Sequence, residues 1–265
     1  MAYRNNLIIT SIDTIKNEGL KRFINYHLLY IMKFKLDDLK DQLLFKKLKF
    51  DPNKNKYLLQ QNNHDINKVF DYANKFRAFT PSIRPAQLKS EFAKFSKLIK
   101  SRKIKNVLEI GTANGGTLYL FSRIINKNGI IVSLDLETPE WKQSFYKSFA
   151  LGKQQIFLVA GNSHKKQTLK RIKKILRNKK IDLLFIDGDH SYKGVKSDFN
   201  LYKDLVKNGG IIAFHDIAAA YIINSHWAEV NKFWIRLKRK YKHIEIIEDK
   251  NRQRAFGIGV MYYHR

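Results

Sequence analysis

Three titratable side chains directly follow an apolar run in the sequence IDLLFIDGDHSY, residues 181–192. The run 183–186 is apolar enough to form a buried strand, and Asp187, Asp189 and His190 come immediately after it. Carboxylates without partners are costly beside a hydrophobic core, so this placement indicates a site with a chemical role. The structural alternative is that Asp189 caps the helix that follows and that His190 packs against the edge of the sheet.

The apolar run 210–214 ends in the same way, at His215 and Asp216. Adjacent parallel strands lie about 4.8 Å apart, so two neighbouring strand ends would bring these residues together with Asp187 and His190. Carboxylate oxygens with an imidazole are suitable ligands for an octahedral divalent ion such as Mg²⁺ or Mn²⁺. A metal there would lower the pKa of a bound substrate hydroxyl. In a version of the site without metal, His190 alone would take the substrate proton.

Alternating apolar runs and amphipathic stretches predict the elements that must position these residues. Strands are predicted over residues 106–110, 129–134, 155–160, 182–186, 210–214, 243–247 and 256–263. Helices are predicted between the first five of them, over residues 116–127, 139–150, 165–177 and 192–207. This series predicts an α/β fold, a Rossmann-like doubly wound sheet of seven strands that is mostly parallel. The short polar link before the final run predicts a hairpin, and therefore an antiparallel last strand.

A glycine-rich loop follows the first predicted strand in NVLEIGTANGGT, residues 106–117. Gly111 and Gly115 let the backbone turn tightly and approach a ligand closely. Three residues separate these two glycines, which differs from the G-x-G-x-x-G dinucleotide fingerprint. Glu109 precedes Gly111 by two positions and would accept hydrogen bonds from a cationic ligand group, whereas it would repel a phosphate. The loop therefore argues against a nicotinamide oxidoreductase.

Polar side chains also end the second and third predicted strands. Asp135 follows the second strand, and a carboxylate in this position suits the two hydroxyls of a ribose. Asn162 follows the third strand, and its amide could read the edge of an adenine ring. Taken singly, each residue could instead be an ordinary turn residue at a strand end. Together, at successive strand ends, they predict a pocket for an adenosine-containing ligand.

The amino-acid composition limits the kinds of site and partner that the chain can have. The 265 residues include 51 Lys or Arg and 23 Asp or Glu, a formal net charge of +28, and no cysteine. The absence of cysteine excludes disulfides, thiolate metal sites and cysteine nucleophiles. Residues 161–181 hold nine Lys or Arg and no acid, which would attract nucleic acid or another polyanion. The alternative is a compositional bias, with solvated lysines on the outer face of an amphipathic helix.

The region before the regular series is predicted to be separate from it. Residues 1–80 read as basic helices that would cap the site or form a surface for a homo-oligomer, and residues 81–265 form the main domain. No stretch reaches the roughly 18 apolar residues of a membrane span, and the first residues lack a signal-peptide core. These features predict a cytoplasmic protein without a membrane span.

The glycine-rich loop and the polar residues at the ends of the following strands resemble, in order and spacing, the motifs of class I S-adenosylmethionine-dependent methyltransferases. The stretches IDGDHSYKGVKSDFNLYKDLVKNGGIIAFHDI and GIGVMYY are similar to the branch that includes small-molecule O-methyltransferases of sugar and antibiotic tailoring, and the resemblance covers about residues 84–265. It implies that the cofactor site is lined by Glu109, Gly111, Asn114, Gly115, Asp135 and Asn162.

The same resemblance implies the roles of the charged strand ends. Asp187 and Asp216 would be metal ligands, and His215 or His190 would be a further ligand or the general base. We therefore assign catalysis to Asp187 and His190, and metal binding to Asp187, His215 and Asp216. His215 stands where metal-dependent relatives often carry an acid.

The implied reaction moves the methyl group of S-adenosylmethionine to a hydroxyl of a small-molecule acceptor, a sugar or a secondary-metabolite-like compound. Residues 217–226 have the position of a loop that covers the substrate, and Trp227 would wall the acceptor pocket. The alternative is an RNA-directed methyltransferase, or a basic nucleic-acid-binding module on the same fold. An Asn-Pro-Pro-Tyr type tetrad, frequent in RNA-modifying enzymes, is absent after the fourth strand.

Overall fold

The computed structural model describes residues 43, 65–75, 83–218, 229–249, 253 and 256–264. Most of the predicted N-terminal region and its boundary near residue 80 lie outside the described residues. Trp227 and all but the first two positions of the predicted covering loop also lie outside them.

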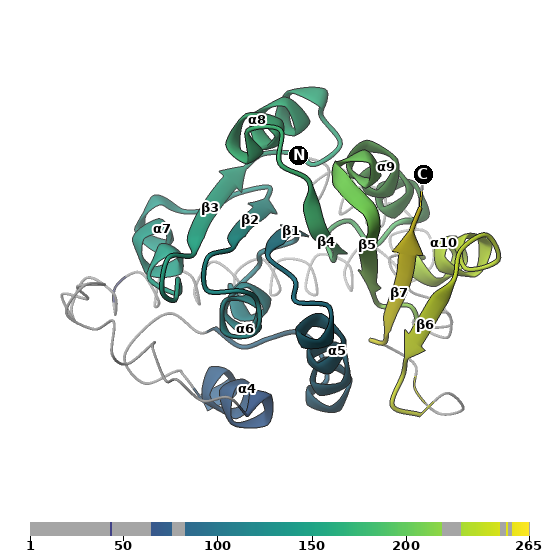
Figure 1. Cartoon of the computed structure of the whole chain (residues 1–265), viewed down its shortest axis with the longest axis horizontal. Coiled ribbons are helices and arrows are strands. Elements are labelled where there is room, and N and C mark those ends of the chain that lie inside the picture. The colour runs from purple at the N-terminus through teal and green to yellow at the C-terminus, as the bar shows by residue number, and fades with distance from the viewer. Residues whose placement is uncertain are drawn as a thin grey trace, which may run out of the picture.

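The described chain forms one seven-stranded sheet in the order β3-β2-β1-β4-β5-β7-β6 (Figure 1). The strands are β1 (Asn106–Ile110), β2 (Ile130–Asp135), β3 (Gln155–Ala160), β4 (Ile181–Ile186), β5 (Val206–His215), β6 (His243–Ile246) and β7 (Ile258–Tyr263). Neighbours among β1 to β5 pair in parallel, and β7 is antiparallel to both β5 and β6. The predicted fold class, the hairpin and the antiparallel last strand are confirmed.

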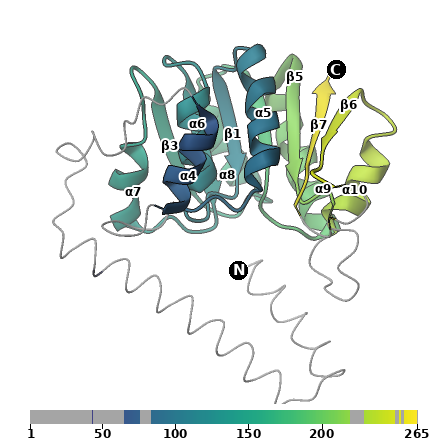
Figure 2. The same cartoon turned by 90° about the horizontal axis from the view of Figure 1, so that it is seen from below.

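Helices cover both faces of this sheet (Figures 1 and 2). One face carries α4 (Ile66–Lys75), α5 (Lys89–Ser101), α6 (Gly116–Ile124) and α7 (Glu140–Lys147). The other carries α8 (Lys166–Leu176), α9 (Tyr192–Tyr202) and α10 (Val230–Leu237). Each face has its own hydrophobic core. The central strand β4 is buried at every position, as expected for a parallel strand covered on both faces.

Helix α4 belongs to the first of these cores although it was predicted within the N-terminal region. Its apolar stripe includes Val69, Phe70 and Ala73, which are buried with Phe92 of α5. The rings of Phe70 and Phe92 lie 6.3 Å apart. Residues 66–75 therefore pack on the main domain, while the division at residue 80 stays a prediction.

The end of α9 differs from the sequence-based expectation. A helix was predicted over residues 192–207, but α9 ends at Tyr202, a 3₁₀ turn (η1) spans Lys203–Leu205, and β5 begins at Val206. Val206 pairs with Ile181, and the register of the two strands shifts before the next pair. Pairing with β4, a tertiary contact, thus decides where the helix stops.

The strand register aligns the ends that carry the predicted site. Ile110 of β1 lies opposite Ile186 of β4, and Ile186 lies opposite Phe214 of β5. The residues that follow these strands therefore meet at one edge of the sheet, as expected for parallel strands. Among the described residues, no helix is long and apolar enough to cross a membrane.

Candidate functional site

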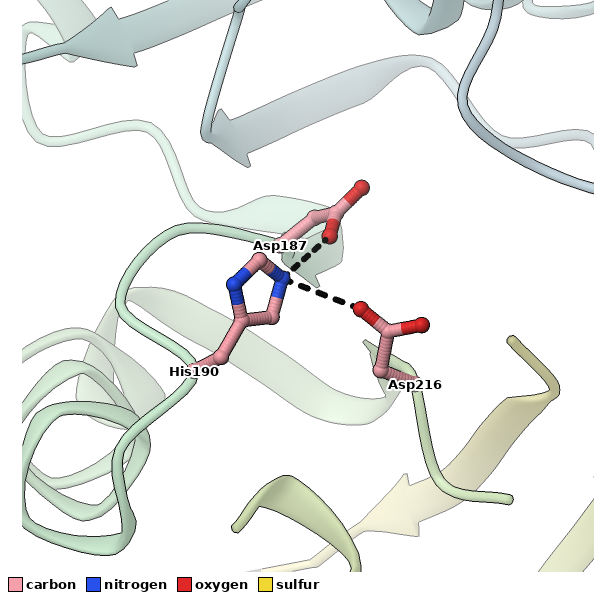
Figure 3. A group of neighbouring side chains, drawn as sticks. All are labelled: Asp187, His190 and Asp216. Carbon is pink, nitrogen blue, oxygen red and sulfur yellow. Dashed lines mark hydrogen bonds and ion pairs between the residues drawn. The ribbon is translucent and has the colours of Figure 1, made fainter. Parts of the chain in front are cut away.

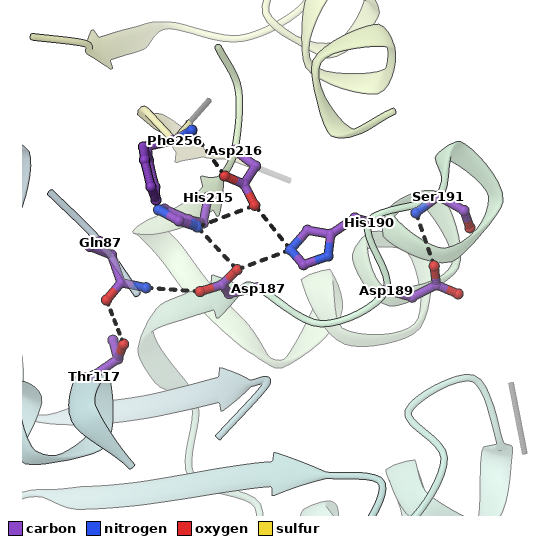
Figure 4. Close-up of polar contacts among 9 residues, drawn as sticks. All are labelled: Gln87, Thr117, Asp187, Asp189, His190, Ser191, His215, Asp216 and Phe256. Carbon is purple, nitrogen blue, oxygen red and sulfur yellow. Dashed lines mark hydrogen bonds and ion pairs between the residues drawn. The ribbon is translucent and has the colours of Figure 1, made fainter. Parts of the chain in front are cut away.

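Two acids and two histidines meet at the carboxyl ends of β4 and β5 (Figure 4). Figure 3 shows three of them, Asp187, His190 and Asp216. His190 Nε2 lies 3.0 Å from Asp216 Oδ2 and 3.4 Å from Asp187 Oδ1. His215 Nδ1 lies 3.1 Å from the same Asp187 oxygen and 3.4 Å from the same Asp216 oxygen. We call these four residues the Asp–His cluster. One atom from each residue thus contributes to a closed ring of four contacts.

The outer oxygen of each carboxylate is held by a partner outside the cluster (Figure 4). Asp187 Oδ2 accepts a hydrogen bond of 2.9 Å from Nε2 of Gln87, whose Oε1 accepts one of 2.7 Å from Thr117. Asp216 Oδ1 accepts a hydrogen bond of 3.1 Å from the backbone amide of Phe256. These contacts fix both carboxylates so that their other oxygens point toward the histidines.

Backbone and burial further constrain the cluster. Asp216 has a φ of +62°, which non-glycine residues adopt rarely and which is often found at functional sites. The His215 side chain is only 3% exposed, and its Nε2 has no hydrogen-bond partner among the described residues. Its ring lies 6.0 Å from the ring of Phe256. His190 is the most accessible member, with 33% of its side chain exposed.

The charges within the cluster stabilise one another. Burial lowers the pKa of His190, but hydrogen bonds to the two carboxylates outweigh burial and raise this pKa to about 10. Burial also lowers the pKa of His215, and the nearby negative charges raise it well above its ordinary value. Burial raises the pKa of Asp216, but the charge of His215 outweighs this and keeps the pKa below its usual range. Both histidines of the cluster therefore favour their protonated forms, and both acids favour their ionised forms.

This donor set is suitable for a metal ion. Ligand atoms of Asp187, His190 and Asp216 lie within 4.8 Å of one another, the spacing that a single ion requires. This group contains His190 and not His215, which the sequence assigned to the metal, but His215 Nδ1 also contacts both carboxylates. A divalent cation would replace the two imidazolium charges, since metal ligands must be deprotonated.

The glycine loop after β1 lies directly against this cluster. Gly111 has a φ of +100°, and a side chain there would overlap the backbone carbonyl of Asp187. The Asp187 amide also donates a 2.8 Å hydrogen bond to the carbonyl of Ile110. At the other end of the loop, Gly115 has a φ of +76° and would overlap Tyr146 if it carried a side chain. The loop can approach Asp187 and α7 this closely only because Gly111 and Gly115 carry no side chain.

Glu109 is completely buried beneath this loop. One of its carboxylate oxygens accepts a very short hydrogen bond from Ser133, whose hydroxyl lies 2.6 Å from that of Thr112. The other oxygen, Oε1, has no hydrogen-bond partner among the described residues. Burial raises the pKa of Glu109 well above its ordinary value, and the charges of Asp187 and Asp135 raise it further. An unsatisfied buried acceptor at this position fits a cationic ligand group.

The remaining predicted cofactor residues line the same edge of the sheet. Asp135 Oδ2 accepts a 2.8 Å hydrogen bond from the amide of Ala113, so it fixes the glycine loop. Asn114 is exposed in that loop. Asn162 Oδ1 accepts a 2.8 Å hydrogen bond from the amide of His164, which is the turn contact that the structural alternative predicted. The adenine-reading role of Asn162 stays a prediction.

The structure corrects one structural assignment. In the structural alternative Asp189 caps α9, but the helix is capped by Ser191, whose hydroxyl accepts a 3.0 Å hydrogen bond from the amide of Gly194. Asp189 instead accepts a 2.9 Å hydrogen bond from the amide of Ser191. His190 contacts both acids of the cluster, and its catalytic role stays a prediction.

Sequence reasoning missed Gln87, Thr117 and Ser133. Ser133 carried a usable signal, since it is the polar residue within the apolar run 130–134. Gln87 and Thr117 carried none, because their contact with each other and with Asp187 joins distant parts of the chain.

Comparison with known proteins relates the sequence to a family. The sequence matches the family described as "Methyltransferase domain" over residues 108–217. The matched segment of the methyltransferase domain runs from β1 to just beyond β5 and includes every member of the Asp–His cluster. The class predicted from the sequence motifs is confirmed.

Solved structures agree with this assignment at the level of the fold. An O-methyltransferase from Bacillus cereus in complex with SAH (S-adenosylhomocysteine) aligns with a TM-score of 0.52 and 16% identity, over 85% of this chain and 97% of that one. The MycE methyltransferase of the mycinamycin biosynthetic pathway, in complex with Mg, SAH and mycinamycin VI, aligns with a TM-score of 0.53 and 17% identity, over 76% of this chain and 55% of that one.

A closer but short similarity exists to an uncharacterised protein of Acanthamoeba polyphaga mimivirus. The two sequences are 61% identical over 36 residues, which span 14% of this chain and 16% of that relative. The chain therefore matches only a small part of the length of this relative.

Proposed function

We propose that this protein transfers the methyl group of S-adenosylmethionine to a hydroxyl oxygen of a small-molecule acceptor, such as a sugar or a secondary-metabolite-like compound. The observation that carries the proposal is the direct contact between the Gly111 loop and the Asp187 backbone. Through this contact the predicted cofactor edge and the Asp–His cluster share one end of the sheet.

The cofactor edge offers complementary groups for S-adenosylmethionine. Oε1 of Glu109, which is buried, would accept a hydrogen bond from the ammonium group of the methionine part. Asp135 would accept hydrogen bonds from the ribose hydroxyls, and Asn162 would contact the adenine. Gly111, Asn114 and Gly115 complete the predicted set. When bound, the cofactor supplies an electrophilic methyl group on a sulfonium.

The Asp–His cluster would bind a divalent ion and handle the acceptor proton. Asp187 and Asp216 would hold the ion together with His215, and the ion would supply Lewis-acid activation of a hydroxyl. Positive charge disfavours imidazolium, so His190 beside a bound ion would be neutral. His190 would then receive the hydroxyl proton while the new C–O bond forms and the S–C bond breaks. Its 33% exposure is consistent with access to an acceptor.

Cofactor binding and catalysis can be tested separately. S-adenosylhomocysteine should raise the melting temperature of the protein whereas NAD should not, because a ligand that binds only the native state stabilises it. Asp135→Ala should remove most of this shift. Failure of S-adenosylhomocysteine to bind the wild-type protein would refute the proposed activity.

Two acids at opposite ends of β4 provide a matched pair for catalysis. Asp187→Asn should lower methyl transfer to a panel of hydroxyl acceptors by at least about 100-fold, with S-adenosylhomocysteine affinity almost unchanged. Asp182→Asn is the control, because Asp182 Oδ2 accepts hydrogen bonds from the amides of Lys105 and Asn106 at the other end of the sheet. Full activity of Asp187→Asn would contradict the catalytic assignment, and full activity in a chelator would contradict the metal.

A polyanion partner is a second candidate, supported by a basic groove. The groove, of about 880 Å³, lies beside α9 and α10. Its lining includes Lys193, Lys232, Arg236 and Arg239. RNA binding with a steep salt dependence that survives Glu109→Ala would favour a binding module over the enzyme. A homo-oligomer and a cytoplasmic location also stay predictions.

A further inference from the structure

We propose that the Asp–His cluster selects a first-row transition ion such as Co²⁺ or Zn²⁺ over Mg²⁺. The inference rests on the proposed function, because it specifies the metal of that same site. It follows from the identity of the donors, their spacing and the way in which the protein holds them.

The spacing of three donor atoms matches that of neighbouring ligands around one small ion. His215 Nδ1 lies 3.1 Å from Asp187 Oδ1 and 3.4 Å from Asp216 Oδ2. Bonds of about 2.1 Å place neighbouring ligand atoms about 3.0 Å apart in an octahedron and about 3.4 Å apart in a tetrahedron. The protein thus holds an imidazole nitrogen at coordination distance from both inward carboxylate oxygens.

The carboxylates are limited to one inward oxygen each. Gln87 holds the outer oxygen of Asp187, and the amide of Phe256 holds the outer oxygen of Asp216. Such contacts orient metal ligands and tune their affinity. If these contacts persist, the cluster offers only two carboxylate oxygens to an ion.

The third donor is an imidazole nitrogen that has little freedom to leave. His215 is 3% exposed and packs beside Phe256, so its Nδ1 stays directed at the carboxylates. His190 Nε2 faces the same two oxygens and is the proton acceptor of the proposed function. Magnesium takes oxygen ligands and keeps several waters, whereas imidazole suits Zn²⁺, Fe²⁺ and Ni²⁺. A buried nitrogen donor beside two carboxylate oxygens therefore favours the transition ions.

The first experiment measures ion binding to metal-free wild-type protein, without any activity assay. Isothermal titration at a fixed pH near 7.5 with CoCl₂, ZnCl₂ and MgCl₂ should give dissociation constants for Co²⁺ and Zn²⁺ at least about tenfold lower than for Mg²⁺. The visible absorption of bound Co²⁺ should indicate nitrogen ligation. Mg²⁺ binding that equals or exceeds that of Co²⁺ and Zn²⁺ would overturn the proposal.

The second experiment assigns the selectivity to His215. His215→Gln keeps a similar size but replaces the nitrogen donor with an amide oxygen, and it should reduce the ratio of Co²⁺ to Mg²⁺ affinity at least about tenfold. His164→Gln is the matched control, because His164 Nε2 lies 3.4 Å from the buried carboxylate of Asp198, outside the cluster. An unchanged ratio in folded His215→Gln would contradict the proposal, and if this variant does not fold, the wild-type titration decides.

These outcomes are separate from those that test the methyltransferase activity. If the proposed activity is wrong, the metal-free protein should fail to bind S-adenosylhomocysteine, and this binding can be measured directly. Failure of the metal proposal would appear as Mg²⁺ preference in a protein that still binds S-adenosylhomocysteine.

Discussion

The contact between Gly111 and Asp187 leads to a quantitative prediction about Gly111→Ala. The new Cβ would lie 2.6 Å from the carbonyl carbon of Asp187, whereas carbon atoms in favourable contact are about 3.5–4.0 Å apart. It would also sit on a residue with a φ of +100°, a conformation that L-residues rarely adopt. Both effects should destabilise the folded state.

A matched glycine separates the two effects. Gly209 has a φ of +75°, but a Cβ there would meet nothing within 4 Å. Gly209→Ala should therefore lower the free energy of unfolding only through its strained backbone, by about 1–2 kcal/mol. In Gly111→Ala, overlap of the new Cβ should lower it by about 1–3 kcal/mol more, for a total of about 2–5 kcal/mol. This total is a large fraction of the usual 5–15 kcal/mol of domain stability, as an order of magnitude.

Urea denaturation of the three proteins, with S-adenosylhomocysteine binding measured in parallel, provides the assay. We expect Gly111→Ala to be less stable than Gly209→Ala by about 1–3 kcal/mol and to lose cofactor affinity. Gly209→Ala should keep that affinity, since it lies far from the carboxyl end of β5. Equal stability of Gly111→Ala and Gly209→Ala would show that the Gly111 loop can move away from Asp187 without cost. The predicted cofactor site and the Asp–His cluster would then not share one end of the sheet.

Three further predictions concern groups around the site. Gln87→Leu leaves Asp187 Oδ2 and the Thr117 hydroxyl without this partner, so it should cost about 1–3 kcal/mol by thermal denaturation and lower Co²⁺ affinity about 10–100-fold. The raised pKa of His190, about 10, predicts that metal-free protein loses stability as pH rises from about 6.5 through 10, because the unfolded state releases this proton earlier. Urea midpoints across that range should fall less in His190→Gln. Ser191→Ala removes the cap of α9 and should cost about 1 kcal/mol in the same assay, and an unchanged midpoint would contradict the capping role.

Local patterns predicted the parts of the site that depend on strand ends. The runs 106–110 and 155–160 were predicted with the observed bounds, because each is a short, mostly apolar segment between turn residues. The meeting of Asp187 with His215 and Asp216 also followed from sequence, since neighbouring parallel strands must end at the same edge.

Local patterns failed at two points: where a distant strand paired with the backbone, and where two nearby residues could both cap one helix. The helix expected up to residue 207 ends at Tyr202 because Val206 pairs with β4. Asp189 resembled a helix cap, yet Ser191 makes that contact, because both residues are good caps and their spacing alone does not distinguish them.

The sequence by itself determined the order of strands and helices, the glycine loop and the types of residue at each strand end. These features are local, since they depend on apolar periodicity and on the conformational freedom of glycine. Only the tertiary structure decided which oxygen of each acid faces the histidines, because Gln87 and Phe256 reach the site from segments that are distant in the chain. It also decided that His215 is a buried donor directed at both carboxylates, since burial is a property of the packed sheet.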